Sequence, residues 1–201
     1  MIITLGNIVF GGKGNGGGAP AAYVVPNGMN FGYSTLTEFP SEGLDFSQKT
    51  NFSHCWYWCS SFTEFPALNL SSGTNFYYAW YRCSSLTEFP MLDLSAGTDF
   101  GYAWAGCSKL VSFPALNLSS GTNFYYAWNN CSSLTNLGGF GTIKKSIDLS
   151  SSTKLTVESI MNVITQAATV TGKTMKFGSD NLAKLTDEQK AVATSKGWTL
   201  A

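Results

Sequence analysis

A 24-residue internal repeat constrains the fold of this chain more than any other feature of its sequence. One cysteine and one tryptophan recur in every unit at this spacing: Cys59, Cys83, Cys107 and Cys131, with Trp56, Trp80, Trp104 and Trp128. The segments 69–80 and 117–128 are identical. Such a period is typical of tandem arrays, in which one unit cannot bury its apolar side alone and stacked units can.

The apolar residues of each unit predict which side faces the core. In one unit the predicted inward residues are Leu86, Phe89, Leu92, Leu94, Phe100 and Trp104. A Ser-x-Gly-Thr stretch between Leu94 and Phe100 predicts a turn. We therefore expect an α/β repeat solenoid, leucine-rich-repeat-like, in which each 24-residue unit forms one short strand, one turn and one short helical or irregular return segment. The tryptophans then form a buried column, while the aligned Glu64 and Glu88 stay exposed.

The chain divides into three predicted segments. Residues 1–30 form a Gly-rich N-terminal attachment arm, because the run 11–18 carries too many glycines to order itself cheaply. Residues 31–155 hold the repeats, and residues 156–201 form a small α/β C-terminal cap. Apolar residues at the start of the arm are expected to pair as a strand with the first coil or with another subunit: Ile2, Leu5, Ile8, Val9 and Phe10.

The cap has its own sequence signals. Thr156 is a predicted N-cap of a helix of about 14 residues, which ends near Thr171-Gly172. Residues 173–177 are expected to form a short strand. The capping box Thr186 to Gln189 opens a second helix, and residues 197–200 form a closing strand.

Composition excludes several classes of function. With 12 basic and 12 acidic residues the formal net charge is zero, so no long-range field attracts the chain to nucleic acid or to anionic lipid. No stretch approaches the roughly 18 apolar residues of a membrane span, and the start lacks the basic and apolar regions of a signal peptide. We expect no nucleic-acid partner, no membrane insertion and no signal-directed export.

Acid–base catalysis is also disfavoured. His54 is the only histidine, which leaves little room for His-dependent catalysis. The aligned Glu38, Glu64 and Glu88 would lie about 5 Å apart along one solvent-facing row rather than across a cleft, as a glycosidase needs. We expect no enzyme activity and no catalytic residues.

The cysteines and two glycine motifs suggest further chemistry. Four cysteines occupy one position in successive coils, a position at which the side chain packs inside. Together with Cys55, all five are expected to be buried, reduced thiols. Zinc is the alternative, since His54, Cys55 and Cys59 offer three ligands where a structural site takes four. The G-x-G-x-x-G match at 12–17 is not followed by a helix pattern, and Gly172-Lys-Thr174 lacks the first glycine of a P-loop. We expect no metal and no cofactor.

A binding face is predicted where the repeat varies. Positions that differ between units usually face solvent, and several of them carry Tyr, Trp or Arg, the residues favoured at binding hot spots. The predicted binding face comprises Tyr57, Trp58, Tyr77, Tyr81, Arg82 and Tyr125. The alternative is that these side chains simply cover the return segments.

The run Phe76-Tyr-Tyr-Ala-Trp-Tyr-Arg-Cys-Ser-Ser-Leu86 resembles the aromatic-Cys-Ser-Ser-Leu signature of BspA-like leucine-rich repeat proteins, and residues 31–155 fit that repeat. The tail from Leu155 to Trp198 looks like the terminal cap of such proteins. The family is similar to surface adhesins of gut and oral bacteria and to tail or fibre proteins of their phages. The resemblance therefore implies recognition or scaffolding, and not catalysis.

We accordingly expect a phage virion component, assembled in the bacterial cytoplasm, that presents its repeat surface for host recognition. The implied partners are other virion proteins, bound through the N-terminal arm, and a bacterial surface glycan or protein. A homo-oligomer is expected, with a trimer inferred from the resemblance to phage fibres. Two alternatives remain: a purely structural virion decoration or fibre subunit, and an adhesin on the bacterial cell surface.

Overall fold

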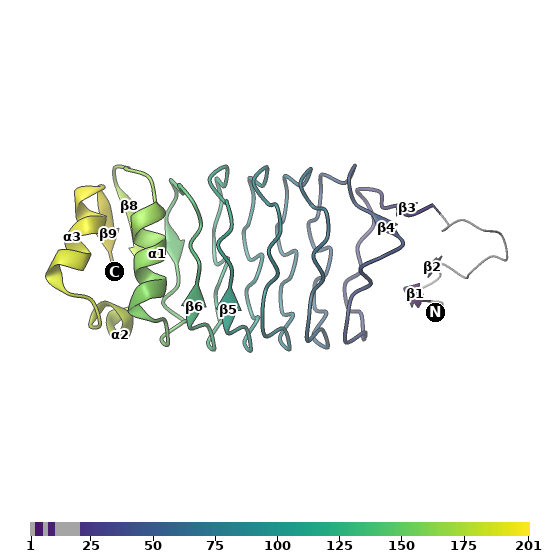
Figure 1. Cartoon of the computed structure of the whole chain (residues 1–201), viewed down its shortest axis with the longest axis horizontal. Helices are drawn as coiled ribbons and strands as arrows, with labels where there is room; N and C mark the ends of the chain where they lie inside the picture. The colour runs from purple at the N-terminus through teal and green to yellow at the C-terminus, as the bar shows by residue number, and fades with distance from the viewer. Residues whose placement is uncertain (1–2, 6–7, 11–20) are drawn as a thin grey trace.

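The computed structural model describes residues 3–5, 8–10 and 21–201 (Figure 1). Its strands are short: β1 (Ile3–Leu5), β2 (Ile8–Phe10), β3 (Tyr23–Val24), β4 (Leu44–Asp45), β5 (Ser112–Phe113), β6 (Asn136–Leu137), β7 (Ile147–Asp148), β8 (Lys173–Lys176) and β9 (Trp198–Leu200). Three helices follow the last repeat: α1 (Val157–Gln166), α2 (Ser179–Leu182) and α3 (Asp187–Ser195). The Gly-rich run at 11–18 lies outside the described residues.

The predicted α/β leucine-rich-repeat solenoid is wrong as a fold class. Among the described residues the strands are few and form small separate sheets, in the orders β1-β2, β3-β4, β5-β6 and β7-β8-β9. All pairs except β1-β2 are parallel. The repeats contain no helix in the described chain, and most of them contain isolated bridges where a strand was expected.

Consecutive turns form the aromatic return segment, where a short helical or irregular segment was expected. In one repeat the amides of Cys55, Cys59 and Phe62 each donate to the carbonyl three residues earlier, at 3.0, 3.3 and 3.2 Å. Left-handed residues separate these turns, for example His54 with φ 57° and Trp58 with φ 58°. Because neither a strand nor a helix tolerates a left-handed residue in its interior, the segment becomes a chain of turns.

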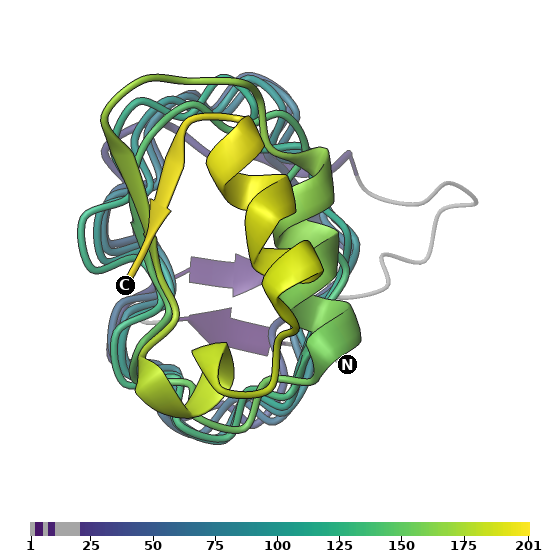
Figure 2. The same cartoon turned by 90° about the vertical axis from the view of Figure 1, so that its left-hand side faces the viewer.

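The chain runs in four successive circuits, which we call windings: residues 39–64, 65–88, 89–112 and 113–136. Backbone hydrogen bonds join neighbouring windings, as when Trp80 N donates to Ala103 O at 2.8 Å and Trp104 N to Ala127 O at 2.9 Å. The windings follow one another along the long axis (Figure 1), and they superimpose in the end-on view (Figure 2). The repeat therefore places equivalent residues in columns.

The interior of the windings is a set of aromatic columns, as the repeat predicted. Trp56, Trp80, Trp104 and Trp128 are all fully buried, and their ring centroids are 5.2, 5.7 and 5.3 Å apart. A second column holds Phe52, Phe76, Phe100 and Phe124, at 5.2, 5.5 and 5.6 Å. The other predicted inward residues, Leu86, Phe89, Leu92 and Leu94, are also buried.

The glycine of the Ser-x-Gly-Thr turn is required by this core. The turn itself is present, with Gly97 N donating to Leu94 O at 2.9 Å. A β-carbon on Gly97 would collide with the ring of Phe100, and Gly73 and Gly121 stand in the same relation to Phe76 and Phe124. Because glycine has no side chain, each of these turns leaves room for a stacked phenylalanine ring.

Two parts of the N-terminal segment are described, residues 3–5 with 8–10 and residues 21–30. β1 and β2 pair with each other in an antiparallel hairpin, with Ile3 opposite Phe10, rather than with the first coil. Residues 21–30 join the first winding instead of extending from it, because β3 pairs in parallel with β4. Lys49 fastens this segment: its buried ammonium donates to the carbonyls of Pro26, Asn27 and Met29 at 2.9, 3.0 and 2.8 Å.

The cap begins as the sequence predicted and then departs from it. Thr156 caps α1 by accepting from Ser159 N, but α1 ends at Gln166, short of the predicted stop at Thr171-Gly172. The capping box of Thr186 and Gln189 opens α3, while the four-residue α2 has no counterpart in the sequence analysis. Side chains of α1 cover the free edge of β6, since Asn162 donates to Leu137 O at 2.9 Å.

Candidate functional site

One exposed side of the windings carries a continuous group of aromatic side chains, which we call the aromatic strip. It consists of Tyr33, His54, Tyr57, Trp58, Tyr77, Tyr78, Tyr81, Tyr102, Tyr125 and Tyr126, together with Arg82. Each ring contacts at least one other ring of the strip. The strip therefore runs from the segment before the first winding to the fourth winding.

The backbone of the strip is held in an unusual conformation. His54, Tyr78, Tyr102 and Tyr126 occupy equivalent positions and have φ values of 57°, 58°, 55° and 51°. Left-handed backbone costs a non-glycine residue roughly 1–2 kcal/mol. Hydrogen bonds between windings offset this cost, for example from Tyr78 N to Gly101 O at 2.9 Å.

These four rings form one column, which is stacked from His54 to Tyr102 and tilted by 31° between Tyr102 and Tyr126. The centroid distances are 5.1 Å from His54 to Tyr78, 4.5 Å from Tyr78 to Tyr102 and 5.4 Å from Tyr102 to Tyr126. The middle pair is almost parallel, with an angle of 4°. Such stacking fixes the orientation of side chains that would otherwise be mobile at a surface, and so pre-organises the strip.

A second group of rings flanks this column. Tyr57 stacks on Tyr81 with centroids 5.1 Å apart, and Tyr33 stacks on Trp58 at 6.5 Å. The guanidinium of Arg82 lies 4.5 Å from the centroid of Trp58 and 5.7 Å from that of Tyr81. These are cation–π distances, and they leave the Arg82 head group at the surface beside two rings.

The structure brings the predicted binding residues together and adds to them. Tyr57, Trp58, Tyr77, Tyr81 and Arg82 lie in one cluster, and Tyr125 joins it through Tyr102, at 5.5 Å. Arg82 and Tyr125 are exposed, while the other four are half-buried by one another.

Sequence reasoning missed five members of the strip: Tyr33, His54, Tyr78, Tyr102 and Tyr126. Four of them share one repeat position that is aromatic in every unit. A position that is aromatic in every unit is typical of a core column, so it is not among the variable positions that predict the binding face. The left-handed backbone at this position is what turns the ring outward.

Burial within the strip shifts the pKa values of two residues. Burial raises the pKa of Tyr78 to about 12, assisted by the neighbouring Tyr77 and Tyr102, so its hydroxyl remains a hydrogen-bond donor. Burial lowers the pKa of His54, and its Nδ1 lies 2.8 Å from the hydroxyl of Ser53. A neutral imidazole in a ring stack serves as an aromatic surface.

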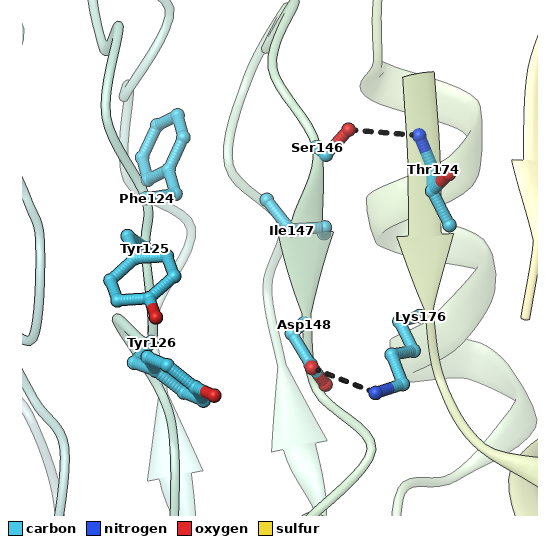
Figure 3. Close-up of a pocket in the computed structure, with 8 residues that line it drawn as sticks. All are labelled: Phe124, Tyr125, Tyr126, Ser146, Ile147, Asp148, Thr174 and Lys176. Atoms are coloured by element: carbon cyan, nitrogen blue, oxygen red, sulfur yellow. Dashed lines mark hydrogen bonds and ion pairs between the residues drawn. The ribbon is translucent and has the colours of Figure 1, made fainter. Parts of the chain in front are cut away.

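A hollow of about 290 Å³ lies where the strip meets the cap (Figure 3). Its lining residues are Phe124, Tyr125, Tyr126, Ser146, Ile147, Asp148, Thr174 and Lys176. The two tyrosines come from the fourth winding, and the polar side chains come from the other side, from Ser146 and β7 and from β8 (Figure 3). Asp148 pairs with Lys176 at 3.3 Å, and Thr174 N donates to Ser146 Oγ at 3.0 Å.

The carboxylate of the hollow is ionised. Burial raises the pKa of Asp148, but two hydrogen bonds from Ser150 and the nearby Lys176 outweigh it and hold the pKa below its ordinary value. The Ser150 amide and hydroxyl donate to Oδ1 at 2.9 and 2.6 Å. The hollow thus presents one anion and one cation, which balance.

Comparisons with protein-family models, with curated proteins and with solved structures found no match. Across residues 21–201 and the two short N-terminal strands, no helix is long and apolar enough to cross a membrane. The strip and the hollow are therefore interpreted from their own chemistry.

The cysteines belong to the core. Cys59, Cys83, Cys107 and Cys131 are fully buried and free, and the last three each donate to a tryptophan carbonyl of the preceding winding at 3.2 to 3.3 Å. Burial raises the pKa of Cys59 to about 11 and that of Cys107 to about 12. These thiols are protonated and lack the thiolate character that nucleophiles and metal ligands need.

The zinc alternative finds no support in the geometry. No group of three or more His, Cys, Asp or Glu side chains in the described chain could hold a metal ion. Cys55 and Cys59 are buried in the core, whereas His54 belongs to the aromatic strip.

The aligned glutamates and the two glycine motifs have the following places in the chain. Glu38, Glu64 and Glu88 are exposed, and Glu38 and Glu64 form a parallel bridge along one row of windings, as expected of a solvated column. Gly172 has φ 65° at a turn before β8, and the match at 12–17 lies outside the described residues.

Proposed function

We propose that this chain is a non-enzymatic binding protein that recognises a bacterial surface through its aromatic strip. The observation that carries this proposal is the continuity of the strip: ten rings and one arginine, each in contact with a neighbour, over four windings and the segment before them. Stacked rings at a surface lose little conformational entropy on binding, because their orientation is already fixed. They suit recognition of a ligand with apolar faces and polar edges.

Catalysis is the weaker alternative on chemical grounds. The only imidazole sits in a ring stack with a lowered pKa, and the thiols are buried and protonated. The aligned glutamates form one row, whereas hydrolysis of a glycosidic bond needs carboxylates on both sides of the bond.

The proposed setting is a phage tail or fibre, and it follows from the resemblance to BspA-like repeat proteins. In that setting the N-terminal segment attaches the chain to other virion proteins, and several copies present their strips together. One strip would bind weakly, and several copies would multiply its effect through effective concentration. A purely structural virion subunit is the second candidate, since the half-buried rings also cover the windings.

Binding of fluorescently labelled protein to a panel of intact gut and oral bacterial cells tests the proposal. The triple change Tyr77→Ala, Tyr81→Ala and Arg82→Ala should reduce cell binding at least tenfold, because it removes a cluster of residue types that dominate interfaces at about 1–2 kcal/mol or more each. Flow cytometry gives the bound fraction for each strain.

A matched control separates the strip from the rest of the surface. The triple change Glu38→Ala, Glu64→Ala and Glu88→Ala removes three exposed side chains outside the strip and should leave binding unchanged. If the strip variant folds and binds every strain as the unchanged protein does, recognition by the strip is rejected and the structural role is favoured.

A further inference from the structure

The stacked column of the strip ends at Tyr126, beside the hollow. Each earlier ring has a ring of the next winding against it, from His54 to Tyr78 to Tyr102 to Tyr126. In the described chain the ring contacts of Tyr126 are with Tyr102 and Tyr125 alone. The position 24 residues further on is Ser150, which carries no ring. The column is therefore open on the side of the hollow.

The backbone beside Tyr126 is open as well. In the third winding Phe100 N, Tyr102 N and Trp104 N donate to carbonyls of the fourth winding at 2.9, 2.8 and 2.9 Å. The equivalent amides of the fourth winding belong to Phe124, Tyr126 and Trp128, and no described group accepts from them. Two of these residues, Phe124 and Tyr126, line the hollow.

The far wall of the hollow is polar and electrically balanced. Asp148 and Lys176 form an ion pair whose side chains are 34% and 53% exposed, and Ile147 is a buried apolar floor. The Tyr126 side chain reaches from the fourth winding towards this wall (Figure 3). A ligand there meets an aromatic wall, amide donors without acceptors, and a carboxylate beside an ammonium.

We propose that the hollow binds one neutral hexopyranose unit of a surface polysaccharide, with a face of the sugar against Tyr126 and Tyr125. This inference names the ligand class at the end of the strip and rests on the proposed recognition function. A pyranose combines a C–H face that packs on an aromatic ring, ring and hydroxyl oxygens that accept from amides, and hydroxyl groups that donate to a carboxylate.

Other ligand classes fit these groups less well. A phosphate or sulfate finds one cation that is already paired with Asp148, and a cationic side chain meets Lys176 itself. An extended peptide needs a length of free strand edge on both sides, whereas the hollow of about 290 Å³ accommodates a group of the size of one ring. A neutral, hydroxylated ring matches both the size and the charge.

Two-dimensional amide NMR on the full chain tests this inference, with five probes added singly: the methyl glycosides of glucose, galactose, mannose, rhamnose and N-acetylglucosamine. At least one should shift the amide signals of Tyr126, Asp148 and Thr174 saturably at millimolar concentration, the affinity expected of a single sugar unit. An N-acetylated tetra-alanine amide, added in the same way, serves as the peptide probe.

Variants at the two ends of the strip give a matched pair. Tyr126→Asn removes the ring at the hollow and Tyr33→Asn removes one at the opposite end, and both positions are left-handed, with φ 51° and 61°, which asparagine tolerates. Tyr126→Asn should weaken glycoside binding about tenfold or more, whereas Tyr33→Asn and Tyr126→Phe should retain it.

The outcomes separate this inference from the proposed function. If no glycoside shifts these amides, if only the peptide does, or if Tyr33→Asn weakens binding as much as Tyr126→Asn, the sugar site is rejected. If the sugar site is rejected but the triple strip variant still loses cell binding, the proposed recognition function stands and the sugar site alone fails. If the unchanged protein binds no bacterial cells, the recognition function fails, and the glycoside titration still decides what the hollow binds.

Discussion

Among single residues, the buried cysteines and tryptophans of neighbouring windings are joined by hydrogen bonds. Each of Cys83, Cys107 and Cys131 donates its thiol to the tryptophan carbonyl of the winding before, so one side chain satisfies a main-chain group inside the core. The four indole nitrogens have no acceptor in the described chain. Edge-to-face packing on phenylalanine, as between Trp80 and Phe89 at 4.9 Å, offsets this cost.

The thiols make stability depend on pH in the alkaline range. An unfolded cysteine ionises near a pKa of about 8.5, and burial raises the pKa of Cys107 to about 12 in the fold. The contribution of Cys107 is complete below about pH 8.5 and falls as pH rises towards 12, because only the unfolded state releases the proton. The loss for one such thiol is about 1 kcal/mol between about pH 7.5 and pH 9.5.

Urea unfolding of the unchanged protein and of Cys107→Ala at these two pH values measures this loss. The variant is less stable at neutral pH because it loses volume from the core, but its stability should fall by about 1 kcal/mol less on going to the higher pH. An equal fall in the two proteins would contradict the buried, protonated thiol.

At the scale of the structural element, each winding depends on turns whose residues leave room for stacked rings. Gly97 lies against Phe100, whose ring stands 5.5 Å from Phe76 and 5.6 Å from Phe124. Moving one ring of such a column disturbs its neighbours on both sides. The turn and the column are therefore one unit of stability.

Gly97→Ala tests this dependence. The added β-carbon meets the Phe100 ring, so the variant should lose about 1–3 kcal/mol of unfolding free energy, as overpacked cores do. Gly28→Ala is the matched control, because nothing lies within 4 Å of a β-carbon at that position. Thermal unfolding of the two variants compares them, and an unchanged Tm for Gly97→Ala would contradict the packing described.

Sequence reasoning identified columns well and elements poorly. The spacing of Trp80, Trp104 and Trp128 was enough to predict a buried column, because a fixed period places equivalent residues together. The expected strands are reduced to isolated bridges and two-residue strands. Left-handed residues such as Tyr78 and Tyr102 break the expected return segments into turns, and tyrosine gives no sequence signal for that conformation. The hollow was missed because it depends on where β7 lies relative to the fourth winding, which the repeat does not determine.

At the scale of the whole molecule, the windings place residues far apart in sequence on one surface. Tyr33 and Tyr125 are 70% and 61% exposed and mark the two ends of the aromatic strip. Met91, 63% exposed, lies outside the strip and is readily oxidised. Oxidation of these three similarly exposed side chains therefore reports separately on the strip (Tyr33 and Tyr125) and on the surface outside it (Met91).

Hydroxyl-radical footprinting of the protein bound to a bacterial strain, compared with the free protein, tests the recognition surface most directly. We expect oxidation of Tyr33, Tyr125 and the rings between them to fall on binding, while oxidation of Met91 stays the same. Protection of Met91 with unchanged oxidation of the tyrosines would contradict recognition through the aromatic strip.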